Sequence, residues 1–161
     1  MSFDFASLIT TRTKDNVQRA TSMNGRDFDS LSASEQTEYL ASLNGAYNVS
    51  DLDRVGLAVQ ALTEELLAAG IRVETSPKTD WAASDIPTET QMAQYLADVA
   101  AIRAALQLPS TAPETPESMH GLTWQSANNI ETILSMVERS LAAMALTLVP
   151  CGDGICGGDY L

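Results

Sequence analysis

Apolar side chains recur at steps of three and four residues in three long segments of the chain. They fall at 52, 55, 59, 62 and 66 in the first segment, at 92, 95, 99, 102 and 106 in the second, and at 127, 130, 134, 137, 141 and 144 in the third. This spacing places them in one stripe on each α-helix. Three stripes are most simply buried against one another, which predicts a helical bundle. The alternative is that one stripe packs against another subunit.

Capping residues indicate where five helices begin and end. The expected helices cover residues 14–23, 33–43, about 49–69, about 87–108 and 124–146. Four begin after a residue whose side chain can accept a hydrogen bond from the first turn: Thr13, Ser32, Asn48 (or Ser50) and Thr123. The third is expected to end at Gly70, which can adopt the left-handed conformation of a helix end, and the fourth before Pro109.

Two stretches depart from the helical pattern. Ile71, Val73 and Thr75 alternate with charged residues, which predicts a short β-like segment. Residues 147–161 are rich in glycine, and their Asp153-Gly154 pair is typical of a hairpin turn. We therefore expect a glycine-rich, hairpin-like C-terminal tail.

The length and composition fit one globular domain. The chain has 161 residues, of which 45% are hydrophobic, enough to bury a core. We predict an all-α fold of about five helices over residues 1–161, with an N-terminal arm at 1–10. The longest apolar run, 141–149, is too short to cross a bilayer, and the first residues do not resemble a signal peptide. We therefore expect neither a membrane anchor nor Sec-type export.

The charge of the chain argues against several partners. Its 21 acidic and nine basic residues give a formal net charge of −12. Proteins that bind nucleic acids use clustered cations to displace counterions from phosphates, and no basic cluster occurs in this sequence. Anionic membrane surfaces are disfavoured for the same reason. We expect no nucleic-acid partner and no membrane partner.

No residue pattern here is typical of catalysis. The one histidine, His120, has no nucleophile motif beside it. Acidic pairs that could serve a glycosidase are Asp51 with Asp53, Glu64 with Glu65 and Asp80 with Asp85, but we interpret them as solvated faces of an acidic protein. We therefore expect neither an active site nor a cofactor.

Both cysteines lie in the tail. Four residues, glycines among them, separate Cys151 from Cys156. They could be free thiols, a hairpin disulfide or half of a zinc site. The other half of a zinc site is missing, and two thiols in a reducing cytoplasm remain reduced.

Aromatic and terminal apolar residues are the candidates for partner contact. Subunits of charge −12 repel one another, so association must be driven by apolar surface. Trp81 lies in a loop and Trp124 opens a helix, where each either packs on the end of the bundle or anchors a partner. The terminal residues either fold back on the domain or reach a neighbour. The candidate partner-binding residues are Phe3, Phe5, Ile9, Trp81, Trp124 and Tyr160.

Five segments resemble phage and prophage structural proteins of Gram-positive gut bacteria. They are residues 9–17 (ITTRTKDNV), 44–56 (NGAYNVSDLDRVG), 77–81 (PKTDW), 85–88 (DIPT) and 121–131 (GLTWQSANNIE). The resemblance covers about residues 9–145, and the order of the segments agrees. At the C-terminal end the similar proteins have a glycine-rich hairpin that lacks cysteines.

The resemblance implies a virion component, and it favours the tail, baseplate or fibre over the capsid shell. Such a protein is assembled in the bacterial cytoplasm, acts through contacts with other virion proteins or with itself, and is expected to be a homo-oligomer. The residues themselves equally fit a second function, that of a soluble acidic adaptor or regulatory module that binds a host or phage protein.

Overall fold

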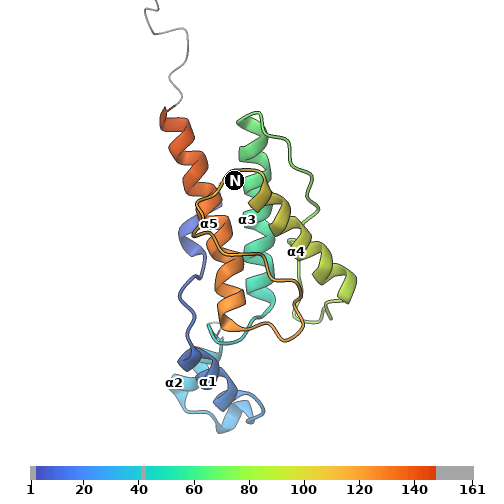
Figure 1. The fold of residues 1–161 in the computed structure, drawn as a ribbon. Coiled ribbons are helices and arrows are strands. Elements are labelled where there is room, and N and C mark those ends of the chain that lie inside the picture. The colour runs from blue at the N-terminus through green and yellow to red at the C-terminus, as the bar shows by residue number, and fades with distance from the viewer. Residues whose placement is uncertain (1–2, 41–42, 148–161) are drawn as a thin grey trace, which may run out of the picture.

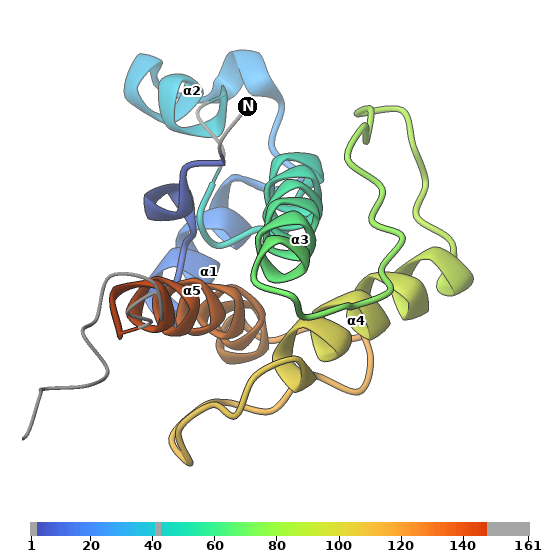
Figure 2. The ribbon, with the colours of Figure 1, turned by 90° about the horizontal axis from the view of Figure 1, so that it is seen from above.

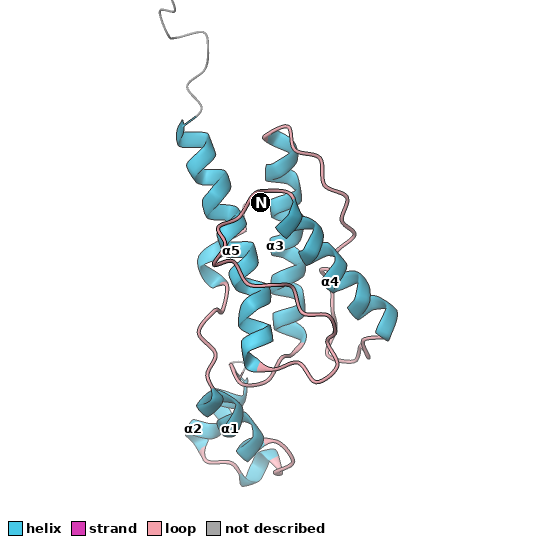
Figure 3. Ribbon diagram, in the orientation of Figure 1, coloured by secondary structure: helices cyan, strands magenta, loops and turns pink. Residues whose placement is uncertain are grey.

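The computed structural model describes residues 3–40 and 43–147, and all regular elements within these ranges are helical (Figure 3). This confirms the predicted helical bundle. The α-helices are α1 (Lys14–Met23), α2 (Ala33–Leu40), α3 (Val49–Ala68), α4 (Glu89–Ala104) and α5 (Trp124–Thr147), and the short 3₁₀ helices are η1 (Phe5–Ser7) and η2 (Phe28–Ser30). The predicted hairpin, Cys151, Cys156 and Tyr160 lie outside the described residues.

The predicted helix starts are confirmed by capping hydrogen bonds. The side chains of Thr13, Ser32, Asn48 and Thr123 each accept a backbone N–H from the first turn of the helix that follows. The start of α4 differs from the prediction. Its cap is Thr88, which exchanges hydrogen bonds with Gln91 in a capping box.

Two helices end earlier than predicted. α2 is helical to Leu40, and Leu43 lies outside it. α4 ends at Ala104, because the chain then turns so that Leu106 and Leu108 pack against the core. The end of α3 is as predicted: Gly70 has φ 82°, and the N–H groups of Gly70 and Ile71 donate to carbonyls of the last turn.

The predicted β-like segment at residues 71–75 does not form a strand. Its alternation of burial is nevertheless present, since Ile71 and Val73 pack against the core while Arg72 and Glu74 are exposed. A strand needs a neighbouring strand to pair with, and here helices occupy the neighbouring positions. The hydroxyls of Thr75 and Thr63 are hydrogen-bonded instead (2.8 Å).

The three long helices run in the same direction (Figure 1). Two long connections, 69–88 and 105–123, return along the bundle between them. In the view from above, α4 crosses beside α3 and α5 (Figure 2). The connections contribute side chains to the core as well: Ile71, Val73, Trp81, Leu106, Leu108, Met119 and Leu122.

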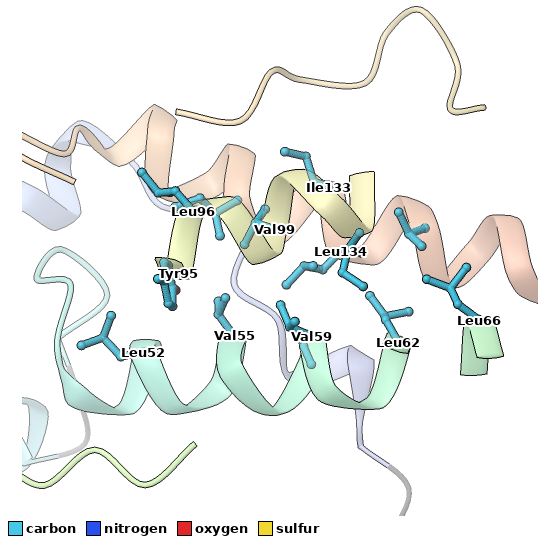
Figure 4. Close-up of a cluster of buried hydrophobic side chains, with 14 of the residues drawn as sticks. Leu52, Val55, Val59, Leu62, Leu66, Tyr95, Leu96, Val99, Ile133 and Leu134 are labelled. Atoms are coloured by element: carbon cyan, nitrogen blue, oxygen red, sulfur yellow. The ribbon is translucent and has the colours of Figure 1, made fainter. Parts of the chain in front are cut away.

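The predicted apolar stripes form the core of the bundle (Figure 4). α3, α4 and α5 contact one another pairwise, so each stripe is buried within the chain and not reserved for another subunit. Leu62, Val99 and Leu134 are fully buried, and each contributes about 1.5–3 kcal/mol by removal from water. Met144, at the end of the predicted stripe of α5, is exposed.

α1 and α2 lie beside one end of the bundle (Figure 1). Met23 and Leu31 are buried there but do not belong to the bundle core. A salt bridge from Arg19 of α1 to Glu35 of α2 joins the two helices, and Arg26, in the turn after α1, bonds to the same glutamate. None of the helices in the described part of the chain is long and apolar enough to cross a membrane.

Candidate functional site

A groove of about 780 Å³ opens between the start of α3, the start of α4 and the segment that precedes α5. We call it the α4 groove. Its apolar lining comes from all three: Leu52, Met92, Ala93, Leu96, Met119 and Leu122. Volumes of this size accommodate a small molecule or a few side chains of a partner.

The rim of the α4 groove is acidic. Glu89 and Glu117 line it together with His120, and all three are exposed. Within the described ranges neither glutamate forms a salt bridge. The hydroxyl of Ser118 accepts a hydrogen bond from the backbone N–H of His120 (3.0 Å), which orders the turn at this edge. The groove therefore combines an apolar surface with two uncompensated negative charges.

Two tyrosines form the inner part of this region. Tyr47 lines the groove, and its hydroxyl is hydrogen-bonded to that of Tyr95, 2.5 Å away. Burial raises the pKa of Tyr47 far above its ordinary value, although the hydrogen bond with Tyr95 opposes the shift. Burial likewise raises the pKa of Tyr95. Both phenols are therefore neutral, and the pair joins the segment before α3 to α4.

Behind Tyr47 lies a buried network of four charged side chains. The Cζ atom of Arg12 lies 5.4 Å from the centre of the Tyr47 ring, in a cation–π contact. Arg12 Nη2 donates to Asp51 Oδ1 and to Glu131 Oε1, both at 2.7 Å. Arg54 also bonds to both carboxylates. The two positive and two negative charges balance, which a buried ionic cluster requires.

The network is closed to water at its centre. Arg12 and Asp51 are each 3% exposed and Glu131 is fully buried. For Arg54, burial alone would lower the pKa. The hydrogen bonds and charges of Glu131 and Asp51 outweigh burial and raise the pKa, so the guanidinium remains charged.

The same network fastens the N-terminal arm to the bundle. The backbone N–H of Ile9 donates to Glu131 Oε2 (2.6 Å), and Arg12 Nη1 donates to the carbonyl of Ile9 (2.6 Å). Asn128 bonds to both the N–H and the carbonyl of Arg12. Phe3 and Phe5 pack edge to face and lie against the core. The arm is thus part of the folded domain.

The structure distributes the predicted partner-binding residues over several places. Phe3, Phe5 and Ile9 are half-buried in the fastened arm. Trp81 is 6% exposed and belongs to the core, with Lys78 over its ring. Trp124 is half-buried at the first turn of α5. Those of the predicted residues that the structure describes are therefore not gathered in one site, and none of these lines the α4 groove.

The interpretation of one acidic pair was wrong. Asp51 was assigned to a solvated acidic face, but it is buried because Arg12 and Arg54 compensate its charge. Its neighbour Asp53 accepts the backbone N–H of Trp81 (2.8 Å). Sequence reasoning also missed Glu131, although its position between Ile130 and Leu134 on the apolar side of α5 was a usable signal. Arg12 carried no comparable signal.

The described residues contain no group of three or more His, Cys, Asp and Glu side chains that could hold a metal ion. Comparisons of the chain with protein-family models, with curated proteins and with solved structures find no match.

Proposed function

We propose that this protein is a structural component of a phage particle, of its tail, baseplate or fibre, and that it works through protein–protein contact. The resemblance of its sequence segments to phage structural proteins motivates the proposal. Three of those segments, 9–17, 44–56 and 121–131, meet in the fold, because they supply Arg12, Asp51, Arg54 and Glu131 to the charge network.

The α4 groove is the observation that best supports a role in assembly. It presents apolar side chains inside a rim that carries Glu89 and Glu117. Apolar surface inside a polar rim is the usual composition of a protein interface. The rigid network behind Tyr47 holds one wall of the groove in place, which reduces the conformational entropy lost on binding.

Charge complementarity indicates the occupant of the groove. The whole chain carries −12, so a second copy would bring further negative charge to an acidic rim. A segment with apolar side chains flanked by lysine or arginine satisfies both the rim and the interior. We therefore assign the groove to a basic, apolar segment of a neighbouring virion protein, while a homo-oligomer would form through other surfaces.

The test is incorporation of charge-reversal variants into particles. Glu89→Lys with Glu117→Lys reverses the rim, and both positions are exposed, so folding is retained. The matched control, Asp29→Lys with Glu74→Lys, makes the same change of net charge at exposed positions outside the groove. Quantitative mass spectrometry of purified particles measures the copies of this protein relative to a major capsid protein.

We expect wild type and control to be incorporated equally and the rim variant to be reduced about tenfold, the effect of roughly 1.4 kcal/mol of lost interaction. Normal incorporation of the rim variant would show that the groove is not the contact. Absence of the wild-type protein from particles would refute the structural role and favour the soluble adaptor in its place.

A further inference from the structure

A second groove lies where α3 and α5 finish, at the end of the bundle opposite α1 and α2 (Figure 1). Its volume is about 390 Å³, and both helices line it. We call it the α3–α5 groove. Apart from two glutamates its lining is apolar: Ala68, Ala69, Leu141, Ala142, Met144 and Ala145. The groove therefore presents apolar surface at one end of the molecule.

Exposed apolar side chains adjoin the α3–α5 groove on α5. Met144, in its lining, is 36% exposed, and Leu146 is 87% exposed. Residues three and four positions apart are neighbours on a helix surface, so Arg139, Ala142 and Leu146 form a row along one side of α5, next to the groove. An apolar surface that is bordered by charged side chains is typical of an interaction site.

Two carboxylates border the groove without a cation between them. Glu65 comes from α3 and Glu138 from α5, and neither forms a salt bridge with any residue that the structure describes. Burial raises the pKa of Glu65, and the negative charge of Glu138 raises it further. The two carboxylates therefore repel each other, and a cation placed beside both would relieve that repulsion.

Arg139 is a cation that its own chain leaves unused. Among the described residues, six of the nine basic side chains form salt bridges. Arg139 is exposed and, within the same residues, is not one of the six. Neighbouring residues of an α-helix point roughly 100° apart, so Arg139 does not face the carboxylate of Glu138 in its own helix.

This end of the molecule thus holds both halves of a contact, with an apolar groove beside an exposed leucine and two carboxylates beside an arginine. In a dimer with a two-fold axis the same patch of each copy meets the other, and every contact occurs twice. We propose that the α3–α5 groove and the adjoining row on α5 bind a second copy of this chain. The two α5 helices lie antiparallel, and Arg139 of each copy faces Glu138 and Glu65 of the other.

The α4 groove does not offer this self-complementarity. Its lining includes Glu89 and Glu117 but neither lysine nor arginine, and for this reason it is assigned to a basic partner. At the α3–α5 groove the repulsion between two copies of charge −12 is screened beyond roughly 8 Å at physiological ionic strength. The contact area is small, so we expect a weak dimer with a dissociation constant of roughly tens of micromolar.

Sedimentation velocity of the full-length protein measures the dimer, at concentrations from about tenfold below to tenfold above the expected dissociation constant. We expect the wild type to dimerise as its concentration rises. Glu138→Arg places two cations at each contact, and Arg139→Glu places only carboxylates there. Each variant should dimerise at least about tenfold more weakly than the wild type, the ratio that roughly 1.4 kcal/mol gives.

An equimolar mixture of the two variants tests the pairing itself. In a dimer of one Glu138→Arg chain with one Arg139→Glu chain, positions 138 and 139 carry opposite charges at both contacts. The mixture should therefore associate at least about tenfold more tightly than either variant alone. Its affinity should remain below that of the wild type, because Glu65 is unchanged and repels the new glutamate at one contact.

The matched controls are Asp29→Arg and Lys14→Glu, which make the same two changes of net charge at exposed positions outside the groove. Both should dimerise like the wild type. Far-UV circular dichroism checks that every variant is folded, and Arg139→Glu is at an exposed position.

Several results would overturn the assignment. A wild type that stays monomeric throughout would show that a second copy does not cover the groove. Unchanged dimerisation of both variants, or a mixture no tighter than its components, would place the contact elsewhere. Loss of the dimer in the controls would show that net charge alone decides. None of these substitutions lies in the α4 groove, so the result is independent of the proposed role in assembly.

Discussion

Replacement of Glu131 by glutamine tests whether the charge network holds the fold together. Glu131 is fully buried and accepts four hydrogen bonds. Oε1 accepts from Arg12 and Arg54, and Oε2 accepts from the backbone N–H of Ile9 and from Arg54. Whichever way the new amide is oriented, its NH₂ group replaces an oxygen that accepts two of these bonds.

The expected loss of stability follows from the two hydrogen bonds that are lost. Each lost hydrogen bond to a charged group costs about 1.5–3 kcal/mol, and two are lost. The substitution also leaves one excess positive charge in the interior, since Arg12 and Arg54 then face Asp51 alone. Breaking a buried ion pair by removing one partner costs about 3–5 kcal/mol, which agrees with the first figure. We expect Glu131→Gln to lower the free energy of unfolding by about 3–5 kcal/mol.

Urea unfolding followed by far-UV circular dichroism measures this change, with the slope of the transition as a check that the same surface is exposed. The matched control is Glu138→Gln, a half-buried glutamate on the same helix that forms no salt bridge with any described residue. Burial and the charge of Glu138 raise the pKa of Glu65, so the control should be neutral or slightly stabilising, within about 0.5 kcal/mol. A loss below about 1 kcal/mol for Glu131→Gln would refute the structural role of the network.

Three further perturbations test other parts of the structure. Leu134→Ala, at a fully buried position of α5, should cost about 2–5 kcal/mol in urea unfolding; a change within about 0.5 kcal/mol would contradict its place in the core. Gly56→Ala should destabilise by about 1–3 kcal/mol despite the better helix propensity of alanine, because the new Cβ would lie 2.3 Å from the carbonyl oxygen of Lys78; thermal unfolding that shows a gain would disprove this contact. Because burial raises the pKa of Tyr47 and Tyr95 above the value near 10 of unfolded tyrosine, stability is retained below about pH 10 and declines as the pH rises further. Replacing both with phenylalanine should flatten that decline between about pH 9 and pH 11, and an unchanged slope would refute the assignment.

Local patterns predicted the helical part of the fold well. A capping residue acts within three positions of itself, so the starts of α1, α2, α3 and α5 could be located before the structure was known. The stripes were also local, because steps of three and four define a helix face whatever it packs against. The predicted end of α4 was wrong, because beyond Ala104 the chain turns so that Leu106 and Leu108 pack against the core. Such packing depends on distant segments and not on the local sequence.

The candidate sites were not predictable in the same way. The α4 groove joins side chains from residue 47 to residue 122, and the charge network joins Arg12 to Glu131. Trp124 was singled out for its size and its position at a helix start, and the structure places it, half-buried, at the first turn of α5. Neither Arg12 nor Glu131 could be paired from spacing, since 119 positions separate them.

The sequence by itself determined an acidic, all-α chain, its stripes and most of its helix limits, because charge, helical spacing and capping act over a few residues. Only the tertiary structure decided that α3, α4 and α5 run in the same direction, that residues 71–75 have no strand to pair with among the described residues, and that Asp51 is buried. The physical reason is the distance along the chain over which each interaction acts. A buried carboxylate is stable only where a distant cation reaches it, and a cavity exists only where separate segments meet.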